Sequence, residues 1–215
     1  MAPIVNSEQF SEFREQGVTV LRGVFSDWVD VLRKGVDANM ADPDPNARIY
    51  TGKDGGGRFF VDYCNWARIT EYKEFIFNSN AATIGAELMD SKKVQLFHEH
   101  VLVKEAATGV PTPWHQDAPY YCVDGTKTVS LWIPLDNVPR ETTPEFISGS
   151  HKWDKFYRPQ RFDGSALNKH DGLEDIPDIN GHRGDYDILG WAVGPGDAIA
   201  FDYRTIHGAP ANASK

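Results

Sequence analysis

Hydrophobic positions in the first part of the chain mostly follow the spacing of helices. A segment that Ser7 is suited to cap carries two phenylalanines on one face. Residues 26–40 and 70–90 show the same periodicity, whereas residues 18–24 alternate as a strand does. We therefore predict that residues 1–92 form a mainly helical N-terminal part.

Beyond residue 92 the hydrophobic pattern changes to that of strands. Residues 93–105 and 128–136 are rich in β-branched side chains and show no helical period. Residues 191–203 predict two strands that are joined by a Gly-Pro-Gly-Asp turn. Helices followed by strands indicate an α+β fold, mainly β, in which residues 93–215 form the core of a single domain over residues 1–215.

Residues 159–190 follow neither pattern, because they contain seven acidic residues, three basic residues and few large apolar ones. A segment of this length without periodicity is usually functional or mobile when it lies inside a compact domain. Two interpretations stay open. The segment is either a lid over a site or a solvated insertion.

The charge balance excludes several classes of partner. Lys and Arg total 22 against 31 Asp and Glu, which gives a formal net charge of −9. Nucleic acids and anionic membranes require a basic face, so we predict neither as a partner and expect a small-molecule substrate. Cys64 and Cys122 form no metal-binding pair and are expected to be reduced thiols. The sequence shows no secretion signal or membrane span, which predicts a soluble, cytoplasmic protein and leaves its oligomeric state open.

A histidine and an aspartate stand two positions apart in the sequence His115-Gln116-Asp117. Extended backbone points such a pair to one face, and an imidazole beside a carboxylate suits a divalent metal of intermediate hardness. His207, just after a predicted strand, is the best candidate for a third ligand. Two histidines and one carboxylate leave three metal positions open, as in oxygen-activating non-haem iron enzymes. For the short motif taken alone, a hydrogen-bonded surface pair is the alternative.

The other histidines carry weaker signals. His98 and His100 share one strand face, where they either line a pocket beside the metal or are simply polar surface residues. With Glu105 and a later histidine they would form a cupin-type metal site, although the glycines expected around that motif are absent. The remaining histidines lie in polar, glycine-rich surroundings and are expected to be solvated: His151, His170 and His182.

Three stretches carry a resemblance to a known family: TPWHQDAPYYCVDGTKTVSLWIPLDNV, EFISGSHKW and PGDAIAFDYRTIHGAPAN. Together they resemble the phytanoyl-CoA dioxygenase family over residues 93–212. The resemblance implies an enzyme that depends on Fe(II), 2-oxoglutarate and O2. It also implies a double-stranded β-helix, a cupin-like jelly roll, with flanking N-terminal helices. By the same resemblance the metal ligands are His115, Asp117 and His207.

The resemblance also concerns the cosubstrate. It places Trp132 in the wall of the 2-oxoglutarate pocket and Gln116 near the cosubstrate, and it implies an arginine on the last strand of the jelly roll. The sequence ends at Lys215, before such a strand, and Arg204 precedes His207. A buried carboxylate requires a cationic partner. We therefore expect the natural protein to continue past Lys215 and to supply this arginine.

The predicted reaction is the oxidation, by hydroxylation or otherwise, of an unactivated C–H bond, with release of succinate and CO2. The sequence shows no dense basic patch for the phosphates of coenzyme A, which favours a small or medium organic substrate over an acyl-CoA. Two alternatives stay open: a non-catalytic jelly-roll binding module, and a cupin-type metalloprotein that uses His98 and His100.

Overall fold

The chain combines helices with antiparallel sheets in the computed structural model, which describes residues 3–52, 56–162, 164–167 and 172–212. Four α-helices lie in these residues: α1 (Ser7–Gln16), α2 (Val29–Ala41), α3 (Thr70–Asn78) and α4 (Ala81–Leu88). The same residues contain ten strands: β1 (Val18–Leu21), β2 (Arg48–Thr51), β3 (Arg58–Tyr63), β4 (His100–Lys104), β5 (Thr112–His115), β6 (Ser130–Trp132), β7 (Glu145–Ile147), β8 (Ile188–Leu189), β9 (Ala198–Phe201) and β10 (His207–Ala209).

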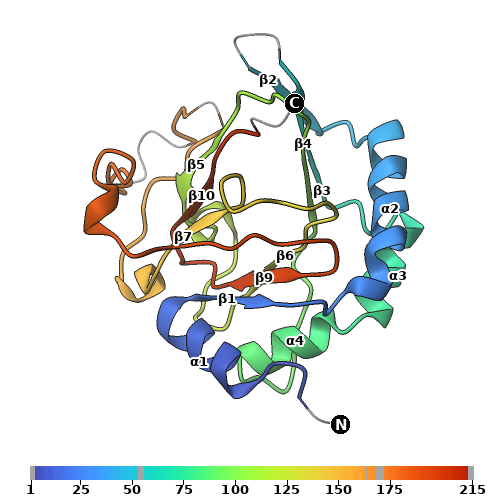
Figure 1. The fold of residues 1–215 in the computed structure, drawn as a ribbon, viewed down its shortest axis with the longest axis horizontal. Helices are drawn as coiled ribbons and strands as arrows, with labels where there is room; N and C mark the ends of the chain where they lie inside the picture. Colours follow the sequence, from blue (N-terminus) through green and yellow to red (C-terminus); the bar gives the residue numbers. More distant parts are fainter. Residues whose placement is uncertain (1–2, 53–55, 163, 168–171, 213–215) are drawn as a thin grey trace.

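The strands form three antiparallel sheets, ordered β1-β9-β6, β5-β10-β7-β8 and β2-β3-β4. Figure 1 shows α1 and α4 alongside β1, and α2 and α3 outside the β2-β3-β4 sheet. Strand β10 is the centre of the four-stranded sheet, because it pairs with β5 on one side and with β7 on the other. Residues far apart in the sequence are thereby brought to one place on that sheet.

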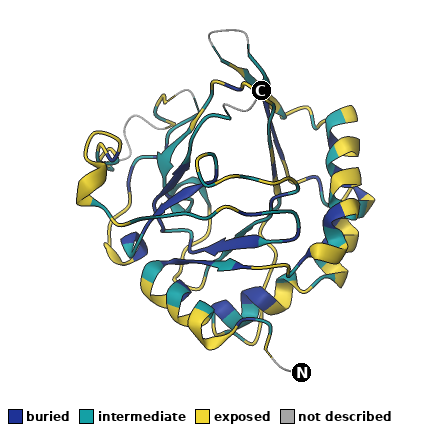
Figure 2. Ribbon diagram, in the orientation of Figure 1, coloured by how far each residue is buried: buried dark blue, intermediate teal, exposed yellow. Residues whose placement is uncertain are grey.

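Strand β9 shows how the core is divided. Ala198 and Ala200 belong to the cluster that α1 and α4 cover, whereas Ile199 and Phe201 belong to a second cluster around Phe146. Figure 2 shows β9 as buried along its length. Successive side chains of a strand point to opposite faces, so the residues of β9 alternate between the two clusters because both faces of the strand are covered.

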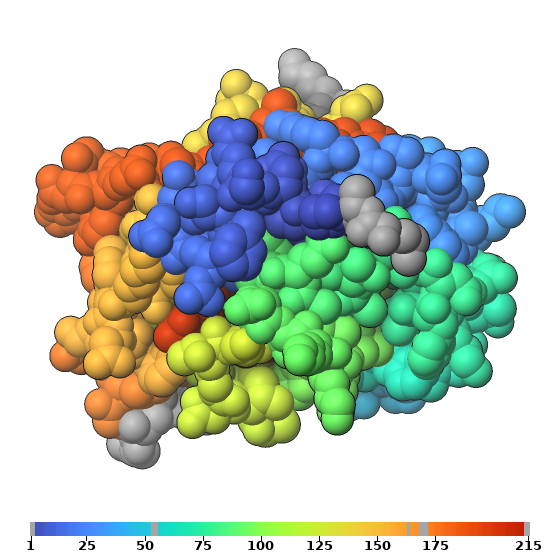
Figure 3. Space-filling model, turned by 90° about the horizontal axis from the view of Figure 1, so that it is seen from below, coloured from blue at the N-terminus to red at the C-terminus, as the bar shows by residue number. Residues whose placement is uncertain are grey.

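Helix α1 begins with a capping box that Asn6 supplies, so the prediction of Ser7 as the cap is wrong by one residue. Asn6 Oδ1 accepts from the Gln9 backbone N–H at 2.9 Å, and the Gln9 side chain accepts from the Asn6 backbone at 3.0 Å. The backbone just before the helix donates to the Glu87 carboxylate of α4. Figure 3 shows this N-terminal segment lying against α4. Gly17 ends the helix with a φ of 81°.

The sequence pattern misses β2 and β3 and overestimates two other strands. Four consecutive residues of β3 are buried, so it lacks the alternation that marks a half-exposed strand. The predicted strand over residues 93–105 is reduced to β4. The first of the two strands predicted over residues 191–203 is reduced to an isolated bridge between Val193 and Val138.

Residues 159–190 are partly ordered by contacts with the rest of the chain. Ile179 is buried, and the segment contains a 3₁₀ turn (Arg183–Asp185) as well as β8. The Phe162 ring contacts those of Tyr50 and Phe59 on the β2-β3 hairpin, with centroids 5.3 and 4.8 Å apart. Residues 163 and 168–171 lie outside the described residues. The lid interpretation stays a prediction.

His151 is buried, which makes its predicted solvation wrong. It lies on a short 3₁₀ turn that contacts the end of α1, where its Nε2 is 3.3 Å from the carbonyl oxygen of Arg14. This contact joins residues far apart in the sequence, so local polarity gave no sign of it. His182 is exposed, as predicted, and His170 lies outside the described residues.

No helix among the described residues is long and apolar enough to cross a membrane. Cys64 and Cys122 are both free and exposed, in agreement with the prediction of reduced thiols.

Candidate metal centre

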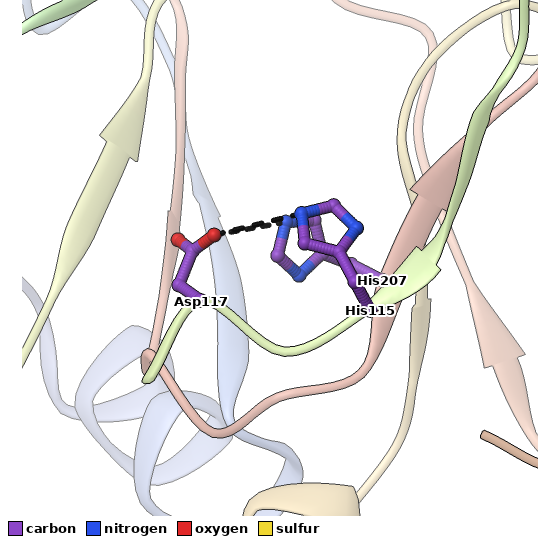
Figure 4. Close-up of side chains that lie close together, drawn as sticks. All are labelled: His115, Asp117 and His207. Carbon is purple, nitrogen blue, oxygen red and sulfur yellow. Dashed lines mark ion pairs between the residues drawn. The ribbon is translucent and has the colours of Figure 1, made fainter. Parts of the chain in front are cut away.

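Two neighbouring strands bring the predicted ligands together. His115 ends β5 and His207 begins β10, and the two residues are partners in the antiparallel pairing. Asp117 Oδ1 lies 3.6 Å from His115 Nε2 and 3.8 Å from His207 Nε2 (Figure 4). The three ligand atoms all lie within 4.8 Å of one another. A single ion can therefore contact all three.

Hydrogen bonds orient each ligand toward this common point. His115 Nδ1 lies 2.8 Å from the Pro113 carbonyl oxygen, and His207 Nδ1 lies 3.0 Å from the Thr205 carbonyl oxygen. Each carbonyl fixes a proton on Nδ1, so the lone pair on Nε2 is directed at the site. Asp117 Oδ2 accepts from the Ser130 hydroxyl at 3.0 Å, which leaves Oδ1 for a cation.

The electrostatics of the site favour the deprotonated ligands. Burial and the adjacent His115 lower the pKa of His207 to about 4. Burial alone would raise the pKa of the Asp117 carboxyl, but His207, His115 and the Ser130 hydroxyl outweigh it and lower this pKa to about 2. At neutral pH a neutral imidazole at His207 therefore faces an ionised carboxylate, which is the state that binds a divalent metal. This donor set fits Fe(II).

A comparison with protein families matches the model for phytanoyl-CoA dioxygenase to residues 13–215. The chain belongs to this family. Its members are 2-oxoglutarate-dependent non-haem iron oxygenases, so the family, the enzyme class and the cofactors predicted from the sequence are confirmed at this level. The match also includes most of the N-terminal part, for which the sequence motifs carried little signal.

Solved structures of such enzymes have a similar fold. The non-haem α-ketoglutarate-dependent carbocyclase SnoK from nogalamycin biosynthesis is 19% identical, with a TM-score of 0.76 over 100% of this chain and 82% of that chain. The epimerase SnoN, in complex with Fe3+, α-ketoglutarate and nogalamycin RO, is 19% identical, with a TM-score of 0.72 over 96% and 77%. EctD from S. alaskensis, with 2-oxoglutarate and 5-hydroxyectoine, is 20% identical, with a TM-score of 0.73 over 99% and 73%. No curated protein sequence matches the chain.

Gln116, between two of the ligands, ties the site to the rest of the fold. It is only 2% exposed. Its Nε2 donates to the carbonyl oxygens of Lys155 and Arg204 at 3.1 and 2.9 Å, and its Oε1 accepts from the Tyr157 backbone N–H at 3.1 Å. These contacts position the backbone that carries the ligands. Its predicted place near the cosubstrate stays a prediction.

Trp132 lies half-buried on β6 and belongs to the cluster around Phe146. The Phe146 ring in turn stacks on His207, with ring centroids 5.7 Å apart. Trp132 therefore packs in the same cluster as the ring that contacts the metal ligand His207. Its role in the wall of a 2-oxoglutarate pocket stays a prediction.

His98 and His100 lie near the metal ligands, as the pocket interpretation requires. Loss of hydration lowers the pKa of both imidazoles, although His100 keeps part of its surface exposed, and both are close enough to Asp117 for its charge to oppose the shift. Glu105, the third member of the cupin-type alternative, is instead held by Arg58 at 2.6 Å. Among the described residues, the predicted triad is the group that could hold a metal ion.

Lys104 is a half-buried cation near β5 and β10 that the sequence analysis does not single out, because a lysine on a strand usually faces solvent. Its Nζ donates to Thr112 Oγ1 at 3.0 Å and to the Pro210 carbonyl oxygen at 3.1 Å, and it lies 5.0 Å from the Phe59 ring centre. Burial lowers the pKa of this ammonium to about 8. The only sequence signal was its place on the same strand face as His98 and His100.

Proposed function

We propose that the protein is an Fe(II)- and 2-oxoglutarate-dependent dioxygenase that oxidises an unactivated C–H bond of a small or medium organic substrate. The observation that carries this proposal is the convergence of His115, Asp117 and His207 on one point. The family membership and the antiparallel sheets support a double-stranded β-helix as the scaffold. The solved relatives bind small molecules such as nogalamycin RO and 5-hydroxyectoine, which supports a substrate of this size.

The residues of the chain would hold the metal from one side. Bound Fe(II), with 2-oxoglutarate and O2, would supply the oxidising power, and succinate and CO2 would be released. The two imidazoles and the carboxylate would hold the ion through three positions and would leave the others for the cosubstrate and O2. The Nδ1 contacts to Pro113 and Thr205 keep both imidazoles in the metal-binding tautomer.

Among the residues that the structure describes, Lys104 is our candidate for the partner of the distal 2-oxoglutarate carboxylate, the role that the family resemblance gives to an arginine. Its hydrogen-bond partner Thr112 lies on β5, three residues before His115, a separation of about 10 Å along a strand. Pro210 lies three residues after His207, on the chain that leaves β10. The ammonium would therefore lie toward the far end of a five-carbon diacid that is chelated at the metal. Its hydrogen-bond partners among the described residues are neutral oxygens. Burial disfavours the charged ammonium, so an anionic ligand would supply the counter-charge that these partners lack.

Metal content and succinate release test the proposal. The wild-type protein, loaded anaerobically with Fe(II), should hold about one ion per chain and should release succinate from 2-oxoglutarate once O2 is admitted. His115→Ala and Asp117→Ala should lose most of both. His182→Ala is the matched control, because it removes an exposed imidazole outside the site.

Two outcomes would contradict the proposal in different ways. Unchanged metal content in both ligand variants would place the ion elsewhere. Normal metal binding by the wild-type protein without any succinate release would favour the non-catalytic binding module instead.

A further inference from the structure

Thr205 lies two residues before the candidate metal ligand His207, on the turn from β9 to β10. It is fully buried, and its backbone carbonyl oxygen is the one that lies 3.0 Å from His207 Nδ1. The direction in which His207 Nε2 points therefore depends on where the backbone of this turn is held. Two buried hydroxyl groups hold it.

The first hydroxyl belongs to Thr205 itself and ties the turn to the end of α1. Thr205 Oγ1 donates to the Gly17 carbonyl oxygen at 2.8 Å. The same oxygen accepts from the Asp202 N–H at 2.9 Å, and the Thr205 N–H donates to the Asp202 carbonyl oxygen at 2.9 Å. Gly17 is 188 positions away from Thr205 along the chain. The end of an N-terminal helix therefore supports the turn that carries a metal ligand.

The contact between α1 and this turn is close enough to require a glycine. Gly17 has a φ of 81°, and a Cβ at this position would lie 2.4 Å from Thr205 Oγ1 and 2.4 Å from His151 Nδ1. Non-bonded atoms do not tolerate such distances. The absence of a side chain at Gly17 thus allows the Thr205 hydroxyl to reach the helix end.

Ser150 supplies the second hydroxyl and holds the next residue of the turn. Its Oγ accepts from the Ile206 N–H at 2.8 Å and donates to the Ile147 carbonyl oxygen at 2.7 Å. The Ile206 carbonyl oxygen accepts from the Ile147 N–H at 2.9 Å. Because Ile206 is held independently of Thr205, loss of the Thr205 hydroxyl should loosen the Thr205 carbonyl without unfolding the turn.

We propose that Thr205 is a positioning residue for the metal. Its hydroxyl, anchored on the Gly17 carbonyl oxygen, fixes the backbone carbonyl that sets the tautomer and the direction of the His207 imidazole. This inference rests on the proposed function, because it concerns the metal site of that oxygenase. It gives the end of α1 a second task besides covering the core, as an outer support of the metal centre.

Binding of Co(II) to the metal-free, full-length protein tests this role without turnover. Thr205→Val keeps the shape of the side chain and removes its hydroxyl. We expect Thr205→Val to bind Co(II) about tenfold more weakly than the wild type, because groups that orient a ligating imidazole affect metal affinity by about 10–100-fold and Thr205 acts through a carbonyl. Thr205→Ser keeps the hydroxyl and should restore most of the affinity.

Thr143→Val is the matched control. Thr143 is also fully buried, but its hydroxyl has no hydrogen-bond partner among the residues that the structure describes. The same replacement there removes no hydrogen bond, so the Co(II) affinity should equal that of the wild type. Equal affinities in Thr205→Val and Thr143→Val would overturn the proposal.

The tautomer of His207 is a readout that a general loss of stability would not move. Nitrogen NMR of labelled histidine in the metal-free wild type should show the His207 proton on Nδ1, and Thr205→Val should show a mixture of both tautomers. A His207 that keeps its proton on Nδ1 in Thr205→Val would overturn the proposal. If Thr205→Val does not fold, Thr205→Cys, whose thiol is a weak donor, replaces it, and wild-type behaviour of that variant would equally overturn the proposal.

The outcomes for this inference and for the proposed function are separate. A wild-type protein that binds Co(II) but releases no succinate when loaded with Fe(II) would contradict only the oxygenase. A wild-type protein that releases succinate, together with a Thr205→Val variant that binds Co(II) as tightly as the wild type, would contradict only the positioning role.

Discussion

The chemistry of the candidate site depends on a few side chains whose neighbours fix their protonation and direction. Backbone carbonyls hold the Nδ1 atoms of His115 and His207, and Ser130 holds the second oxygen of Asp117. The backbone geometry of two neighbouring strands therefore prepares the ligands before any metal binds. Family motifs identified these three residues from the sequence. They did not identify Lys104, our candidate for the carboxylate partner, because no local pattern shows its burial.

The pKa of Lys104 gives the first prediction. Because burial lowers it to about 8, the ammonium of the ligand-free protein loses its proton as the pH rises through 8. If Lys104 binds the 2-oxoglutarate carboxylate, the affinity should fall above pH 8 by up to about tenfold per pH unit. Titration calorimetry of the anaerobic Fe(II) protein between pH 7 and 9.5 measures this.

Two variants at the same position separate charge from structure. Lys104→Arg should bind 2-oxoglutarate with little dependence on pH over this range, because a guanidinium stays protonated. Lys104→Met should bind it weakly at every pH. A wild-type affinity that is constant from pH 7 to 9.5 would show that another group holds the carboxylate.

The second prediction concerns the buried amide of Gln116. Replacing it by Ala removes three hydrogen bonds and leaves backbone groups of Lys155, Arg204 and Tyr157 without their partner. We expect the free energy of unfolding to fall by about 2–3 kcal/mol, together with weaker metal binding. Urea unfolding measures the first effect. The control is Gln95→Ala at an exposed position. If the free energy of unfolding of Gln116→Ala falls no further than that of this control, the positioning role is refuted.

At the scale of elements, the strand β10 links the two histidine ligands to the core. It pairs with β5 at His115 and with β7 at Phe146. Local periodicity predicted α1, α2 and the helical character of residues 70–90, but not the break that divides this stretch into α3 and α4. It missed β2 and β3, which form a local hairpin, because four consecutive residues of β3 are buried and β2 is mostly exposed, so neither strand alternates. Gly17 ends α1 with a φ of 81°, a conformation that glycine adopts readily.

The third prediction concerns the attachment of residues 159–190. The Tyr120 hydroxyl donates to the Gln160 carbonyl oxygen at 2.5 Å and accepts from the Gln160 N–H at 2.7 Å. The Tyr120 ring also contacts His115, with centroids 5.7 Å apart. Tyr120→Phe removes both hydrogen bonds and should speed amide exchange at Gln160 and Leu167. Tyr63→Phe, which removes an exposed hydroxyl at the end of β3 and outside this segment, is the control, and identical exchange in the two variants would contradict this coupling.

At the scale of the whole molecule, the sheets bring together ligands that are about 90 positions apart along the chain. An α+β fold, mainly β, with helices in its N-terminal part follows from the order of the patterns and from the family motifs. The pairing of β5 with β10, and the burial of His151 against α1, depend on contacts between distant segments. Such contacts have no local signal in the sequence, which is why the burial of that histidine was not foreseen.

A metal held by both β5 and β10 would act as a cross-link across this sheet, and that gives the last prediction. A ligand that binds only the folded state stabilises it by about 2.7 kcal/mol at one hundred times its dissociation constant. For a protein of this size, this corresponds to a rise in Tm of roughly 5–10 °C. Anaerobic calorimetry with Fe(II) should show this rise in the wild type and in His182→Ala, but not in His207→Ala. If the wild type binds one ion per chain and its Tm does not change, the ion is bound equally well by the unfolded chain and does not bridge the two strands.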